Sequence, residues 1–308
     1  MTSVTTHLLD PEDAALTAMM RTAAAPGKGL LRGIEARAPF DALMESVQPH
    51  DNLAFESDTI GGVRGLWVQP AHYRPDEAIL HLHGGWFNFG SARAYRHLVG
   101  HLAARAGARA FIPEYRLAPE HPFPAGVDDV EACYRGLDER DIRRVAVTGD
   151  SAGGNLALVL ASRVSSEAFL VKAKLVGVAV ISPVTDLTLS SATYETRAAA
   201  EPYFTRAQVT ELVGSYLGSA DPTQPRASPL EARLAGLPPL RIHVGEDEVL
   251  LDDSRRYVER AVGAGVDAHV DVWQGMAHGF PGSVGKLKAA TRALDAIGKF
   301  LTARLMQE

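Results

Sequence analysis

Residues 145–153 read VAVTGDSAG, and this stretch decides the fold. A short apolar run (145–148) leads into the turn GDSAG, and a helical pattern follows at once over 152–163. A serine on a sharp strand-to-helix turn, flanked by glycines that let strand and helix pass closely, has the form of a nucleophile elbow. The helix N-terminus beneath the serine adds free N–H groups and positive potential. The stretch therefore predicts Ser151 as a nucleophile, and a glycine-rich turn without chemistry is the alternative.

Outward from this turn, short apolar runs alternate with helical patterns. Strands buried on both faces and alternating with helices are typical of a mostly parallel sheet with helices on both sides. The expected strands are 78–82, 108–113, 145–148, 176–182, 240–244 and 269–273, with earlier candidates inside 53–69, and the expected helices are 92–106, 125–137, 152–163, 253–262 and 284–305.

Two regions break this alternation. Residues 1–50 read as two polar-rich helices separated by APGKG, and residues 186–236 read as a helical insertion punctuated by prolines. We expect both to form a small helical cap over the sheet edge. The α/β core would then consist of 51–185 and 237–308, as a single catalytic domain.

The composition excludes several classes of function. A hydrophobic fraction of 46% and a charged fraction of 22% over 308 residues are those of an ordinary globular protein. A net charge of −6 leaves no basic footprint for nucleic acid. The single cysteine, Cys133, allows neither an intramolecular disulfide nor a cysteine-rich zinc site. Without a signal peptide or an apolar run of about 18 residues, we expect a cytoplasmic protein with no membrane span.

A second motif, HLHGGW (81–86), ends the first buried strand. Two consecutive glycines there let backbone N–H groups converge, and in a protein with a G-x-S-x-G turn such a loop supplies one side of an oxyanion hole. The N–H of Ala152 would supply the other side. The H-x-H pair His81 and His83 raises the alternative of a metal site, but no other cluster has ligand spacing. We expect His83 to hydrogen-bond within the loop and no metal to bind.

A serine nucleophile needs a base and an acid that orients it. His278 lies on the loop after the last expected strand, and the chain order Ser, acid, His fits this position. The stretch GEDEVLLDDS (245–254) after the strand 240–244 holds five carboxylates. Either Glu248 or Asp247 could face His278, and spacing alone does not choose between them.

With these motifs, YRLAPEHPFPA (115–125) and GMAHGF (275–280) resemble the bacterial hormone-sensitive-lipase-like esterases (family IV) of the α/β-hydrolase fold. The resemblance runs from about residue 55 onward. It implies that Gly84, Gly85 and Ala152 donate the oxyanion N–H groups. It also implies an acid of the form D-x-L, which falls on Glu248 as a glutamate variant.

The loop departs from the family at one position, because Trp86 stands where members commonly carry a third glycine. A bulky side chain beside the hole would narrow or line a substrate pocket, and packing under the cap is the alternative. The candidate pocket residues are Trp86, Phe87, Asp150, Tyr203 and Phe204.

The sequence thus predicts a serine carboxylesterase that acts on short- to medium-chain esters through an acyl-enzyme, without a metal or an organic cofactor. The alternatives are a formamidase, an amidase-type enzyme or a lactone hydrolase of the same fold, and a non-catalytic member that binds small molecules. The resemblance also leaves a homodimer possible.

Overall fold

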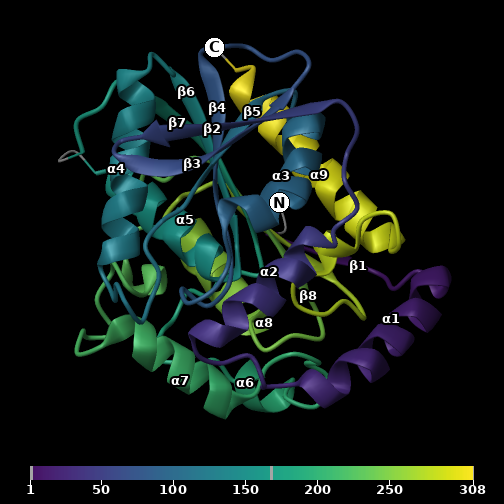
Figure 1. The fold of residues 1–308 in the computed structure, drawn as a ribbon. Coiled ribbons are helices and arrows are strands. Elements are labelled where there is room, and N and C mark those ends of the chain that lie inside the picture. The colour runs from purple at the N-terminus through teal and green to yellow at the C-terminus, as the bar shows by residue number, and fades with distance from the viewer. Residues whose placement is uncertain (1–2, 167–168, 308) are drawn as a thin grey trace.

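The computed structural model describes residues 3–166 and 169–307 (Figure 1). The described residues form a nine-stranded sheet in the order β1-β9-β8-β7-β6-β4-β5-β3-β2. The strands are β1 (Val4–His7), β2 (Leu53–Ile60), β3 (Val63–Pro70), β4 (Glu77–Leu82), β5 (Arg109–Pro113), β6 (Arg144–Asp150), β7 (Lys174–Ile181), β8 (Leu240–Gly245) and β9 (Ala268–Trp273). Strand β3 runs antiparallel to its neighbours β2 and β5, and the remaining pairs are parallel. The predicted mostly parallel sheet is confirmed.

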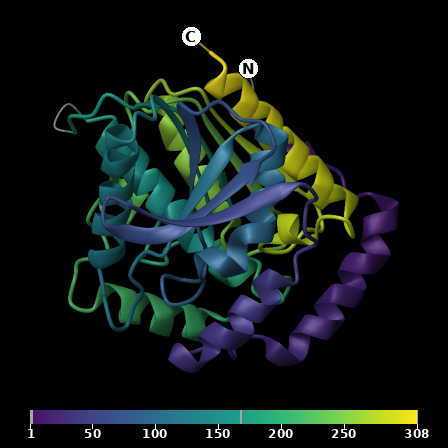
Figure 2. The same ribbon diagram turned by 45° about the horizontal axis from the view of Figure 1, so that its top comes forward.

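Helices cover both faces of the sheet (Figures 1 and 2). Alternate residues of a strand point to opposite faces, so Ile79 packs with α3 and α9 while Leu80 packs in the core that includes α4, α5 and α8. These helices are α3 (Ala92–Ala106), α4 (Ala125–Glu139), α5 (Ser151–Val164), α8 (Leu251–Gly263) and α9 (Lys288–Leu305).

Two elements differ from the sequence prediction. Strand β1 was not expected, because its residues are mostly exposed and lack an apolar alternation; it forms by pairing with β9, where Val4 lies opposite Val270. Helix α9 begins at Lys288 instead of residue 284. Its first N–H groups, those of Lys288 and Ala289, donate to the carboxylate of Asp13, so a distant side chain caps the helix.

The two irregular regions lie together at one end of the molecule (Figures 1 and 2). Their helices are α1 (Pro11–Ala24), α2 (Arg37–Glu45), α6 (Thr193–Thr196) and α7 (Arg206–Leu217), with single 3₁₀ turns at Ala25–Gly27, Ile34–Ala36 and Pro229–Glu231. Hydrogen bonds join the regions: Gly29 N–H donates to the Tyr203 carbonyl at 2.8 Å, and the Gln208 side chain donates to the Leu31 carbonyl at 2.8 Å. We call the helices α1, α6 and α7, together with residues 197–205 that join α6 to α7, the helical layer.

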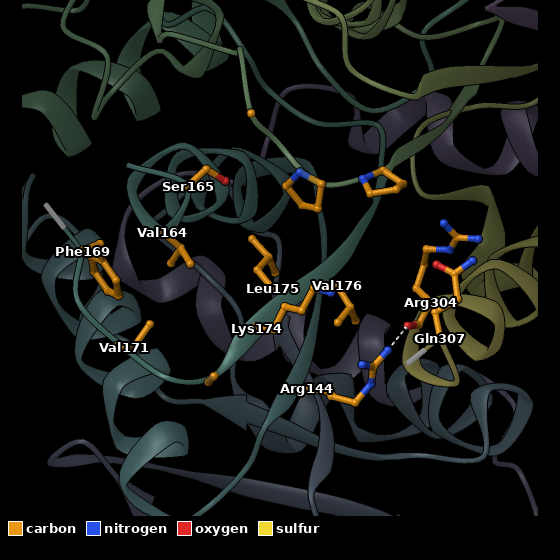
Figure 3. A pocket seen from close by; sticks show the side chains of 14 residues that line it. Arg144, Val164, Ser165, Phe169, Val171, Lys174, Leu175, Val176, Arg304 and Gln307 are labelled. Carbon is orange, nitrogen blue, oxygen red and sulfur yellow. Dashed lines mark hydrogen bonds between the residues drawn. The ribbon is translucent and has the colours of Figure 1, made fainter. Parts of the chain in front are cut away.

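A hollow of about 410 Å³ opens at the opposite end of the sheet (Figure 3). Lys174 and Leu175, at the start of β7, line it together with Arg304 at the end of α9. The Arg144 guanidinium donates a hydrogen bond to the backbone oxygen of Arg304 at 2.8 Å. The hollow is therefore remote from Ser151, which follows the other end of β6. No helix within the described ranges combines the length and the apolarity that crossing a bilayer requires.

Candidate active site

Ser151 lies on the turn between β6 and α5, as the sequence predicts. Its φ angle is 54°, in the left-handed region that L-residues rarely adopt, and the residue is 3% exposed. The glycines are sterically required, because a Cβ on Gly153 would lie 1.9 Å from the carbonyl oxygen of Leu82. This geometry holds the serine side chain at the carboxyl end of the sheet in the strained conformation of a nucleophile elbow.

His278 and Glu248 form a hydrogen-bonded pair on the loops after β9 and β8. The Nδ1–H of His278 donates to Oε2 of Glu248 at 2.8 Å, which leaves Nε2 as the basic nitrogen. The other oxygen of Glu248, Oε1, accepts from the Ser182 hydroxyl at 2.7 Å and from the Gly245 N–H at 2.6 Å. Glu248 is 0% exposed, so these three donors fix a buried carboxylate in one orientation.

Asp247, the other candidate for the acid, points elsewhere. Its carboxylate forms an ion pair with Arg21 of α1, which also donates to the carbonyls of Ala200 (2.6 Å) and Gly275 (3.0 Å). The spacing in the sequence could not choose between Asp247 and Glu248. In the structure, Glu248 is the carboxylate that pairs with His278.

The charges around His278 favour its protonated form. Burial by itself lowers the pKa of the imidazole, but the hydrogen bond and charge of Glu248, followed by the charges of Glu201 and Asp150, outweigh burial and raise the pKa above its ordinary value of 6.5. An imidazolium formed during a reaction would thus be stabilised where it forms.

The loop after β4 differs from the prediction at Gly84. The N–H of Gly84 donates to Oδ1 of Asp150 at 3.0 Å, and Oδ2 of Asp150 accepts from the Tyr95 hydroxyl at 3.0 Å. An N–H committed to a buried carboxylate cannot also serve a substrate oxygen, so the assignment of Gly84 as an oxyanion donor is wrong. Asp150, predicted to line the substrate pocket, anchors the loop through these two bonds.

Other donors remain available near Ser151. In the described part of the chain, no protein acceptor lies within hydrogen-bond reach of the N–H groups of Gly85 and Trp86. Both residues have positive φ, 114° and 50°, which turns the chain sharply at this point. Ala152 lies in the first turn of α5, where N–H groups have no partner within the helix.

The aromatic candidates divide into two groups. Phe87 is 1% exposed and stacks on Tyr216 of α7 with ring centroids 3.8 Å apart, so its role is packing. Phe204 meets Trp86 edge to face at 5.4 Å and His278 at 5.0 Å, which places the Phe204 ring next to the imidazole and against Trp86. Tyr203 packs on Phe204 and lines a small hollow of about 40 Å³ with His278 and Arg21.

The two histidines of the H-x-H pair are engaged in hydrogen bonds. His83 Nδ1 contacts the Gly84 carbonyl at 2.9 Å, which confirms its expected bond within the loop, and His81 Nδ1 contacts the Thr148 hydroxyl at 2.9 Å. Within residues 3–166 and 169–307, no group of three or more histidine, cysteine, aspartate or glutamate side chains could hold a metal.

Sequence reasoning missed three residues of the site. Ser182 could have been suspected, because it follows β7 at the edge where β6 and β8 also end. Arg21 and Glu201 carry no local signal, since they reach the site only through the packing of the helical layer.

These features define an α/β-hydrolase. A family model described as alpha/beta hydrolase fold matches residues 79–282. The chain is 38% identical to an acetyl-hydrolase of Streptomyces hygroscopicus over 79% of this chain and 81% of that protein, and 33% identical to an esterase of Acinetobacter venetianus over 86% and 88%. A crystal structure of an esterase from the bacterial hormone-sensitive lipase family superposes with a TM-score of 0.88 at 34% identity, covering 96% of this chain and 99% of that one. The chain belongs to this hormone-sensitive lipase family and is an esterase.

Proposed function

We propose that this esterase hydrolyses short- to medium-chain carboxylic esters through Ser151, His278 and Glu248. The observation that carries the proposal is the 2.8 Å hydrogen bond between His278 and the buried Glu248, at the same sheet edge as the elbow serine. A serine, an imidazole and a fixed carboxylate are the groups that acyl transfer to water requires.

The reaction proceeds in two steps. His278 Nε2 takes the hydroxyl proton as Ser151 attacks the ester carbonyl, and Glu248 holds the imidazole and stabilises the imidazolium. The alcohol leaves with a proton from His278, and an acyl group stays on the serine oxygen. Water then attacks this acyl-enzyme with His278 again as base, which releases the acid and restores the serine.

The negative oxygen of each tetrahedral intermediate needs donors that are in place beforehand. We assign this role to the N–H groups of Gly85, Trp86 and Ala152, since the Gly84 N–H is bonded to Asp150. Each such donor contributes about 2.7–4 kcal/mol to the transition state.

The substrate range follows from the surroundings of His278. The ring of Phe204, which packs against Trp86, restricts the space beside the imidazole and favours small ester groups. An acetyl-hydrolase among the relatives is consistent with a short acyl chain. Residues 11–50 and 186–236 act as a cap that shields this space from water, and their hydrogen bonds to each other support that role; residues 4–7, which belonged to the predicted cap segment, are instead strand β1 of the sheet.

Hydrolysis of p-nitrophenyl esters of increasing acyl length tests the proposal. Wild-type protein should turn over the acetate and butyrate esters, and Ser151→Ala and His278→Ala should lose roughly 10⁴-fold or more in kcat. Activity should decrease as pH falls through the raised pKa of His278, above its ordinary value of 6.5, because the base must be neutral. Ester turnover that survives in Ser151→Ala would refute the mechanism, and turnover of formamides but not esters would move the function to amide hydrolysis.

A further inference from the structure

A second buried carboxylate, Glu201, lies beside the His278–Glu248 pair. It belongs to the helical layer, between α6 and α7, and is 1% exposed. Its Oε1 accepts from the Tyr203 N–H at 2.8 Å, and its Oε2 accepts from the Val249 N–H at 3.3 Å. Because Val249 directly follows Glu248, this carboxylate connects the layer to the loop that carries the proposed catalytic acid.

The surroundings of Glu201 couple it to the imidazole. Burial raises the pKa of Glu201 to about 7; the charge of His278 and the Tyr203 N–H lower it, while the charge of Glu248 raises it. The coupling is mutual, since the charge of Glu201 raises the pKa of His278. The same backbone segment carries Phe204, whose ring lies 5.0 Å from the imidazole.

We propose that Glu201 is a positioning residue for His278: its carboxylate, when ionised, stabilises the imidazolium formed when Ser151 attacks, and its bond to the Val249 N–H holds segment 201–204 against the Glu248 loop. This inference rests on the proposed function of Ser151, His278 and Glu248. It assigns the helical layer an electrostatic part in the reaction in addition to covering the site.

Other ionisable groups also affect the protonation of His278. From the loops of the core, Glu248 and Asp150 also face His278. From the helical layer, Tyr194 of α6 and Tyr203 face Glu201, and burial raises the pKa of both phenols, so they stay neutral and add no compensating charge. Arg21, the nearest cation of α1, is bound to Asp247 and to the Ala200 carbonyl. Glu201 is thus a carboxylate near His278 that the core does not supply, and it carries its negative charge above its pKa of about 7.

The test compares Glu201→Gln with wild type in pH–rate profiles for p-nitrophenyl acetate. Loss of the Glu201 charge should lower the pKa of His278. Because Glu201 itself loses its charge below a pKa of about 7, the acid limb of kcat/KM should move to lower pH by less than one unit. The plateau of kcat should fall about tenfold, because the imidazolium is less stabilised, while KM changes little. Glu195→Gln is the matched control, since Glu195 is an exposed glutamate of α6 paired with Arg206 at 3.3 Å. Its profile should superpose on that of wild type.

Two further measurements separate the charge from folding. Glu201→Asp keeps the charge, so its acid limb should stay near that of wild type even if shortening lowers the melting temperature. An NMR titration of His278 in the Ser151→Ala background, with and without Glu201→Gln, should show the same shift to lower pH without relying on turnover.

The outcomes distinguish the two proposals. If Ser151→Ala abolishes turnover but Glu201→Gln leaves both the acid limb and the imidazole titration in place, the inference about Glu201 is overturned and the proposed function stands. If Ser151→Ala keeps its activity, the proposed function itself has failed.

Discussion

The α/β core and the helical layer contribute to the site in different ways. Ser151, Glu248 and His278 follow β6, β8 and β9, so hydrogen-bonded parallel strands set their relative positions. The layer reaches the same place through isolated contacts: Arg21 on Asp247, Glu201 on Val249 and Phe204 on His278. On the proposed mechanism, the sheet edge supplies the reacting groups, and the layer adds a further carboxylate and an aromatic ring beside them.

The sharpest test of this division uses two adjacent carboxylates. Glu248→Gln removes the negative charge that orients His278, and kcat should fall roughly 10³–10⁴-fold. Asp247→Asn removes the charge that faces Arg21 of the layer, and kcat should fall only a few-fold. Steady-state kinetics on p-nitrophenyl acetate measures both. A larger loss in Asp247→Asn would make that residue the acid.

We expect low pH to destabilise the core because it protonates a buried histidine. Burial lowers the pKa of His243, on β8, to about 4. The contribution of neutral His243 to the free energy of unfolding is fully present above pH 6.5, the ordinary pKa of the imidazole. Up to about 3 kcal/mol of this contribution is lost as the pH falls toward 4.

Urea unfolding of wild type and His243→Gln at pH 7 and pH 4 measures that contribution. The stability advantage of wild type over the variant should shrink by this amount at pH 4. An advantage that is equal at both pH values would show that His243 does not titrate between them.

The layer should determine which esters fit. Phe204→Ala removes a ring that lies 5.0 Å from His278 and 5.4 Å from Trp86. The added space should raise kcat/KM for hexanoate relative to acetate about tenfold, which corresponds to roughly 1.4 kcal/mol. Competition between the two p-nitrophenyl esters gives this ratio directly, and an unchanged ratio would remove Phe204 from the substrate space.

The smallest effect concerns the attachment of the layer. Arg21→Met should break the contacts of α1 with Asp247, Ala200 and Gly275. Because this side chain is 27% exposed, we expect a cost of only about 1 kcal/mol, or roughly 2–4 °C in melting temperature. Thermal unfolding followed by circular dichroism measures it. A loss of more than 10 °C would show that the layer stabilises the core far more than isolated contacts imply.

The sequence by itself determined the fold and the first members of the site. The alternation of apolar runs and helices predicted the parallel sheet, and GDSAG after a strand predicted the elbow, because both signals are local. The family resemblance favoured Glu248, and the 2.8 Å contact with His278 agrees with it.

Only the tertiary structure decided which neighbours those residues meet. Spacing could not choose between Asp247 and Glu248, because the choice depends on Arg21, which lies more than two hundred residues away in the chain. The bond from the Gly84 N–H to Asp150 and the approach of Glu201 to the site also join segments distant in sequence. A local pattern reports which backbone conformation a segment adopts, whereas hydrogen bonds between buried side chains depend on how separate segments pack.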